Sequence, residues 1–212
     1  MNCGTILFTT TEGDIMNKEF LGTAPIGGLL FKLALPTVTA QLINMLYNIV
    51  DRIFIGHIEG IGDLALTGVG VCMPIIMTVS AVAALVSSGG APRASIAMGE
   101  KKMDSAEKIL GNCFSLQIVI SAILTVILLI FNRPLLLAFG ASENTIEYAC
   151  NYMNIYAIGT VFVQLTLGMN AFVTAQGYSK IAMLSVVIGA VTNIALDPLF
   201  IYVFGMGVRG AA

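Results

Sequence analysis

The stretch "LALPTVTAQLINMLYNIVDRIFIG", Leu33–Gly56, indicates the class of fold to which the chain belongs. It carries no charged residue before Asp51, and it exceeds the roughly 20 residues that a helix needs to cross a hydrocarbon core of about 30 Å. The composition of the whole chain agrees, because apolar residues make up 57% and charged residues 10%, with a mean hydropathy of +0.92. A soluble domain carries about 25% charged residues. The chain therefore cannot cover a water-facing surface, and we predict a membrane protein.

Four more long apolar segments follow, and Asp197 is the one charged residue within them. Each segment should be a helix, because lipid offers no partners to free backbone groups. A closed β-barrel would show alternating segments of about ten residues instead. We predict an all-α integral membrane protein, a polytopic bundle of five complete transmembrane helices and the start of a sixth near Gly207. The four segments are Leu66–Ser88, Ile109–Phe131, Tyr148–Gln176 and Ile181–Phe204.

The Lys and Arg residues predict the orientation of the spans. Seven of them fall on one side of the membrane and three on the other, so the N-terminus is expected in the cytoplasm. The stretch "RASIAMGEKKMDSAEK", residues 93–108, is interpreted as a solvated cytoplasmic connector that sets the topology. Residues 1–15 lack the features of a cleaved signal peptide. They are expected to form a disordered tail before a membrane lobe over 16–212, with Met16 as an alternative start.

Several kinds of site have no support in the sequence. The four cysteines form no CxxC pair and His57 is the single histidine, which argues against a transition-metal site. There is no Gly-rich phosphate loop, and we interpret Gly27–Gly28 and Gly89–Gly90 as helix ends. No basic block indicates nucleic-acid binding, and no cluster of nucleophile and base indicates an enzyme. We therefore expect neither a catalytic role nor a cofactor.

A stripe of polar side chains runs along the first span and ends at Asp51. At about 100° per residue these side chains fall within an arc of roughly 120°. Such a stripe is costly against lipid, so it should face protein or a water-filled cavity. Two alternatives stay open: Asp51 and Arg52 could form an interfacial pair that ends the helix, and Pro36 could lie in its first turn rather than at a kink. The stripe comprises Thr37, Gln41, Asn44, Tyr47, Asn48 and Asp51.

The fifth span carries a second polar pair, because Asn193 and Asp197 are four residues apart and share a helix face. A lone carboxylate in a bilayer costs about 2.5–3.5 kcal/mol, which favours a functional role over mere helix pairing. Asp51 and Asp197 lie about 30 Å and 24 Å along their helices from the cytoplasmic side, so the two could meet. A weaker stripe marks the fourth span, where hydroxyls bonding to their own backbone are an equal alternative; it comprises Thr166, Asn170 and Thr174.

At these residues the sequence resembles the multidrug and toxic compound extrusion (MATE) transporters. The resemblance covers about residues 20–212 and rests on "LALPTVTAQLINMLYNIVDRIFIGH", "GMNAFVTAQG" and "NIALDPLFIYVFGMGVRGAA", which occur in the expected order. It implies one lobe, the N-terminal one, of a fold with twelve helices in two lobes. It also implies export of organic cations or other amphipathic drugs in exchange for protons or sodium ions, without nucleotide hydrolysis. A second lobe, or a second half-chain, is then expected as a partner.

The resemblance assigns roles to particular residues. Pro36 matches a kink-forming proline, and Asp51, Asn193 and Asp197 match the site that takes up the coupling proton or sodium ion. The two carboxylates repel, so at least one of them is expected to hold a proton near neutral pH. Arg52 departs from the family pattern, and a hydroxyl ligand expected from the sixth helix would lie beyond Ala212. The drug cavity is assigned to Gln41, Asn44, Tyr47 and Asn170.

Three rival interpretations remain at this stage. A lipid-linked oligosaccharide flippase of related fold would need basic residues in its cavity, and no Lys or Arg lies deep within a span. A membrane enzyme would need a reactive cluster. An inactive, truncated half-transporter is the third, because about half of the expected architecture is present. We expect a multi-pass protein of the cell membrane that contacts lipid and does not bind nucleic acid.

Overall fold

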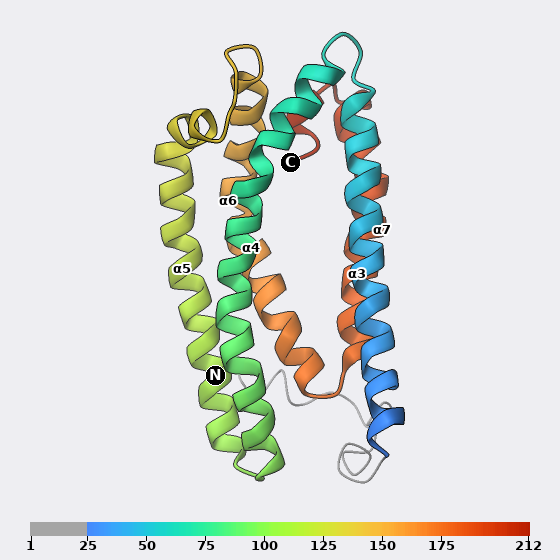
Figure 1. Cartoon of the computed structure of the whole chain (residues 1–212), viewed down its shortest axis with the longest axis vertical. Coiled ribbons are helices and arrows are strands. Elements are labelled where there is room, and N and C mark those ends of the chain that lie inside the picture. The colour runs from blue at the N-terminus through green and yellow to red at the C-terminus, as the bar shows by residue number, and fades with distance from the viewer. Residues whose placement is uncertain (1–24) are drawn as a thin grey trace.

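The computed structural model describes residues 25–212, so the predicted tail over residues 1–15 lies outside the described residues. The chain forms five long α-helices, whose axes lie roughly along the long axis of the molecule (Figure 1). A π-helical turn and a 3₁₀ turn follow the last of them. The elements are α3 (Ile26–Gly56), α4 (Gly62–Gly99), α5 (Met103–Ala138), α6 (Ile146–Ala175), α7 (Ser179–Pro198), η1 (Leu199–Val203) and η2 (Gly207–Arg209).

The predicted all-α membrane bundle is confirmed. Five helices are long and apolar enough to cross a membrane, and residues 25–212 contain no strand. The expected start of a sixth span corresponds to the short 3₁₀ turn η2. Helices α3, α4 and α5 are longer than the predicted spans: at about 1.5 Å per residue, the 38 residues of α4 measure nearly twice a hydrocarbon core. Their polar ends therefore extend beyond the apolar runs that identified them.

Two local predictions are wrong. The expected connector over residues 93–108 is mostly helical, because only Glu100–Lys102 separate α4 from α5. Lys101 makes the tight turn with a φ of 61°, and Lys102 forms an ion pair with Glu100 at 2.7 Å. Gly89–Gly90 is not a helix end either, since it lies inside α4. A Cβ at Gly90 would collide with side chains of α5 and α6, so this glycine permits close helix packing rather than a turn.

The helices form two groups, which we call the three-helix group (α4, α5 and α6) and the α3–α7 pair. Packing is extensive within each group and sparser between them, and Figure 1 shows α3 beside α7, on the opposite side of α4 from α5. Buried amides join the three-helix group: Gln117 Nε2 donates to the Ala83 carbonyl at 3.2 Å, and Gln164 Nε2 donates to the Val79 carbonyl at 2.7 Å. The first and last of the five long helices, α3 and α7, therefore pack against each other.

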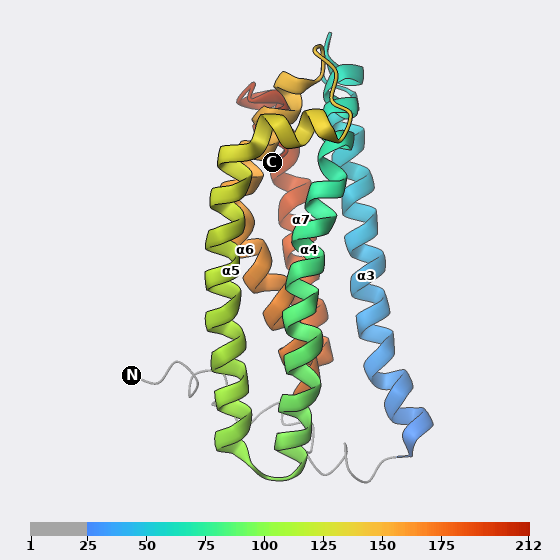
Figure 2. The same ribbon diagram turned by 60° about the vertical axis from the view of Figure 1, so that its left-hand side comes forward.

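Helix α5 breaks near one end of the bundle. Phe131 leaves helical geometry with φ −101° and ψ 15°, three residues before Pro134. A proline inside a helix removes a backbone hydrogen bond and clashes with the preceding turn, which explains a break at this place. The rest of α5 then lies across the end of the bundle (Figure 2). The predicted end of the third span at Phe131 coincides with this break.

The two groups meet at the end of the bundle that carries His57, which we call the His57 end. There Ile55 of α3, Ile201 of η1 and Val208 of η2 join one apolar cluster with residues of α4, α5 and α6. At the opposite end, the Lys101 end, Asn170 of α6 donates to the backbone of α7 at Ala182. The α3–α7 pair is therefore attached to the three-helix group near both ends, and the polar stripe of α3 lies between these attachments.

Candidate functional site

The two intramembrane carboxylates come together on the α3–α7 pair. Asp51 is part-buried near the His57 end of α3, and Asp197 is only 3% exposed near the same end of α7. The side chains interact electrostatically with each other. Asn193 joins them, because its Nδ2 donates to Asp197 Oδ1 at 3.2 Å. The structure thus gathers the three residues that the sequence assigned to ion coupling.

Oxygen atoms in this site lack hydrogen-bond donors. Asp51 Oδ1, Asn193 Oδ1 and Asp197 Oδ2 are buried, and none has a partner within the described protein. A buried acceptor without a donor is costly, and the cost is larger for a carboxylate. A proton on a carboxyl group or a hard cation among the oxygens would remove that cost, because hard cations take oxygen ligands. These three oxygen atoms therefore fit a site for a proton or a sodium ion.

Two tyrosines of α6 complete the surroundings of this site, and the sequence reasoning missed both. Tyr152 is 8% exposed and interacts electrostatically with Asp51 and Tyr47. The hydroxyl of Tyr156 is buried without a partner, and Tyr156 also interacts with Tyr47. The spacing of Tyr148, Tyr152 and Tyr156 at i, i+4 and i+8 was a signal in the sequence. It could not be used without knowing that this face of α6 points toward α3.

The residues assigned to a drug cavity do not all gather at the carboxylates. Asn44 and Tyr47 lie part-buried on the stripe of α3, whereas Gln41 is exposed. Asn170 lies nearer the Lys101 end, where its Nδ2 is 3.2 Å from both the Ala182 carbonyl and Ser185 Oγ. Ser185 precedes Asn193 by eight residues, or about 12 Å of helix. Asn170 thus joins α6 to α7 at a different depth from the carboxylates.

Several hydroxyls on the stripes bond to their own helices, as the alternative interpretation expected. Thr174 Oγ1 donates to the Asn170 carbonyl at 3.1 Å, and Thr37 Oγ1 donates to the Leu33 carbonyl at 3.0 Å. Asn48 does the same with its amide, donating to the Asn44 carbonyl at 2.7 Å. These side chains satisfy themselves locally. They differ in this respect from Asp51 Oδ1 and Asp197 Oδ2, which have no partner among the described residues.

The structure also bears on the two alternatives for the first span. Arg52 is exposed and points toward α4, with Nη2 3.1 Å from Met73 Sδ. It makes no ion pair with Asp51, since the ion pair found within residues 25–212 joins Lys102 and Glu100, and α3 continues to Gly56. Pro36 lies well inside α3, where it is buried, and not in the first turn. The helix is continuous through it, so the kink remains a prediction.

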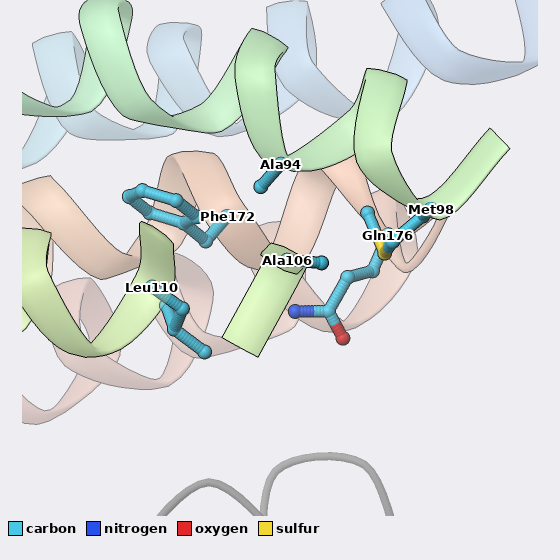
Figure 3. A pocket seen from close by; sticks show the side chains of 6 residues that line it. All are labelled: Ala94, Met98, Ala106, Leu110, Phe172 and Gln176. Carbon is cyan, nitrogen blue, oxygen red and sulfur yellow. The ribbon is translucent and has the colours of Figure 1, made fainter. Parts of the chain in front are cut away.

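Two hollows in the described chain are separate from the carboxylates. Figure 3 shows the first, at the Lys101 end, where the three-helix group encloses only about 10 Å³. Phe172 and Leu110 are among the side chains that line it, and so small a volume leaves no room for a drug. The second is an open depression of about 370 Å³ around the turn between α3 and α4, from Gly56 to Leu64. Neither hollow is lined by Asp51 or Asp197. The first is lined by Ala94, Met98, Ala106, Leu110, Phe172 and Gln176.

These features define a polytopic helical membrane protein with an acidic site inside its membrane region. The chain belongs to the MatE family, whose model matches residues 36–199. The resemblance to MATE transporters that the sequence motifs indicated is therefore confirmed.

Two named transporters are similar to this chain over most of its length. An FAD transporter of Shewanella oneidensis is 25% identical over 200 residues, which are 92% of this chain and 44% of that protein. The multidrug export protein MepA of Staphylococcus haemolyticus is 27% identical over 84% of this chain and 39% of its own length. The crystal structure of a MATE in the straight conformation superposes with a TM-score of 0.83 at 26% identity, covering 96% of this chain and 43% of that one. The chain spans less than half the length of these proteins.

Proposed function

We propose that this chain forms one lobe of a secondary transporter that exports organic cations or other amphipathic drugs in exchange for protons or sodium ions. The observation that carries the proposal is the set of buried, unpartnered oxygens on Asp51, Asn193 and Asp197. Membership of the MatE family and similarity to a multidrug export protein support the same function. The relatives also include an FAD transporter, so the export assay should compare substrates of both classes.

The proposed mechanism uses differential binding of the ion to two conformations. Without a proton or cation, two carboxylates repel across the contact between α3 and α7. Loading the site removes that repulsion and satisfies the orphan oxygens, which favours closer packing of the α3–α7 pair. The polar stripe through Asn44 and Tyr47 belongs to the same helix as Asp51. A change in α3 packing would therefore change the surface offered to the drug, as alternating access requires.

Transport by this scheme needs a cavity closed by two lobes that move against each other. We therefore propose that a second lobe or a second half-chain completes the transporter in the cell membrane, with the N-terminus of this chain in the cytoplasm. A cysteine placed at Glu59, in the turn between α3 and α4, should react with an impermeant reagent outside intact cells, and one at Lys102 should not. The reverse labelling pattern would invert the orientation.

The test of the function is drug export by cells that produce the complete transporter containing this sequence. Asp51→Asn and Asp197→Asn should each abolish export while the protein is still inserted, because a neutral amide is less costly to bury than a charge. Asp63→Asn is the matched control, since Asp63 is exposed in the first turn of α4. Quantified membrane expression must accompany each measurement. Normal export by both Asp51→Asn and Asp197→Asn would show that the carboxylates do not couple transport.

A further inference from the structure

A contact at the His57 end joins α3 to the segment that follows α7. The Tyr202 hydroxyl donates to the carbonyl oxygen of Phe54 at 2.7 Å. The two rings also touch, edge to face, with centroids 6.4 Å apart and planes at 84°. Phe54 lies three residues beyond Asp51, and Tyr202 lies five residues beyond Asp197. The contact therefore lies about one helical turn beyond each carboxylate and joins α3 to η1.

The acceptor in this contact is a carbonyl that the helix itself cannot fully satisfy. The last four carbonyls of an α-helix have no intrahelical partner, and Phe54 belongs to the last turn of α3. The His57 backbone N–H is 3.2 Å from both the Ile53 and Phe54 carbonyl oxygens, so these two acceptors share it. The Tyr202 hydroxyl supplies the Phe54 carbonyl with a donor of its own.

The backbone after Asp197 brings Tyr202 to this carbonyl. Pro198 ends α7, and the chain continues as the π-helical turn η1, in which the Phe204 N–H donates to the Leu199 carbonyl at 2.9 Å. In an α-helix, residues five apart point about 140° away from each other. A turn closed by i→i+5 bonds holds more residues than an α-helical turn, so it narrows that angle. Asp197 and Tyr202 can then both lie on the side of the chain that faces α3.

We propose that Tyr202 is a positioning residue for the ion-coupling site, holding α7 in the register that places Asp197 against Asp51. This inference rests on the coupling role proposed above for the two carboxylates. Tyr202 acts through Phe54 and the helix backbones and does not itself hold the ion. Tyr47 on α3 interacts electrostatically with both carboxylates, and Tyr152 on α6 interacts with Asp51.

The experiment compares infrared absorption of the carboxyl groups in variants of the full chain held in lipid nanodiscs at one fixed pH. Difference spectra of Asp51→Asn and Asp197→Asn against the unmodified chain assign the bands of the two carboxyl groups. Tyr202→Phe keeps the ring and deletes the hydroxyl. We expect it to shift the assigned bands, because a change in helix register alters the surroundings of both carboxyl groups. Tyr178→Phe, the same change at the other end of α7, should leave them in place.

A second variant separates the hydrogen bond from ring packing. Phe54→Leu removes the edge-to-face contact but keeps the carbonyl acceptor. Unchanged bands in Tyr202→Phe would overturn the proposal. If Phe54→Leu shifts the bands and Tyr202→Phe does not, ring packing rather than the hydrogen bond sets the register. The spectra need no transport, so a positive result here stands even where drug export fails. Normal export by both Asp51→Asn and Asp197→Asn, together with the expected band shifts, would instead refute the proposed function while leaving Tyr202 as the residue that sets the register.

Discussion

The three-helix group and the α3–α7 pair differ in the chemistry of their buried polar side chains, although both contain buried side-chain oxygens without a hydrogen-bond partner. In the three-helix group the fully buried groups Gln117 and Gln164 are neutral amides, and each uses its N–H to bond a backbone carbonyl of α4. In the α3–α7 pair the buried groups at the centre of the site are carboxylates, which accept hydrogen bonds but cannot donate them when ionised. An amide can therefore tie helices together unaided. A buried carboxylate needs a proton, a cation or a hydrogen-bond donor from another group.

The two regions also differ in how much they bury. Helix α4 buries a row of small and branched side chains along most of its length. Helix α3 fully buries only Pro36 and Ile55 among its described side chains. A helix held by few buried contacts opens and shifts at lower cost than one in a continuous core. This difference predicts that α4, α5 and α6 form a stable scaffold and that α3 and α7 move more readily, and four measurements can test it.

The largest effect is expected from putting a carboxylate into the scaffold. Gln164→Glu replaces the N–H donor to Val79 with a second oxygen, and a charged carboxylate in the bilayer costs about 3 kcal/mol. The free energy of unfolding, measured by detergent titration in bicelles, should fall by about that amount. Gln164→Leu is the control and should cost about 1 kcal/mol, near the upper range for interhelical hydrogen bonds in membranes. Equal losses in both variants would mean that charge does not distinguish the two regions.

A smaller loss is expected from adding bulk where the scaffold is tightest. A Cβ at Gly168 would overlap the Gln117 side chain, which is itself fully buried. Overpacking typically costs about 1–3 kcal/mol, so Gly168→Leu should lower the free energy of unfolding by about 2 kcal/mol. Gly159 lies on the same helix with open space beside it. Gly159→Leu should leave stability nearly unchanged, and a similar loss in both variants would point to helix propensity rather than packing.

A gain in stability is expected when the carboxylates are neutralised. The double change Asp51→Asn and Asp197→Asn removes their repulsion and supplies amide donors, which should raise the free energy of unfolding by about 1–2 kcal/mol in alkaline, sodium-free buffer. The gain should shrink when the unmodified chain is measured with sodium or at lower pH, because the ion then satisfies the same oxygens. Destabilisation under every condition would show that the carboxylates are structural.

The smallest effect is expected where the two regions touch at the Lys101 end. Asn170→Ala removes the amide that joins α6 to α7 at Ala182 and Ser185. Such bonds in membrane proteins average about 0.6 kcal/mol, so stability should change by roughly that much. Drug export should persist, because Asn170 lies at a different depth from the carboxylates. Complete loss of export at normal expression would instead support the assignment of Asn170 to the drug cavity.

Much of the fold and the acidic site was readable in the sequence, and the reasons are physical. A single charge in an apolar run is conspicuous, which is why Asp197 was found, and helix periodicity placed Asp51 at the end of a stripe. Helix ends were not readable, because solvent-exposed turns beyond the bilayer have no apolar signal; Arg93 and Lys108 were therefore misplaced in a connector. Tyr152 was missed because its role depends on the rotation of α6 about its axis, which only packing against α3 decides.

The pairing of α3 with α7 affects the order in which the helices assemble during synthesis. The hydrogen bond between Phe54 and Tyr202 closes a loop of 148 residues. At about 5–20 residues per second, a ribosome takes roughly 7–30 s to make that length of chain. During this interval α3 is already available to the membrane while its partner does not exist, and Asp51 has no Asn193 or Asp197 beside it. The α3–α7 pair can therefore form only after α4, α5 and α6 have been made.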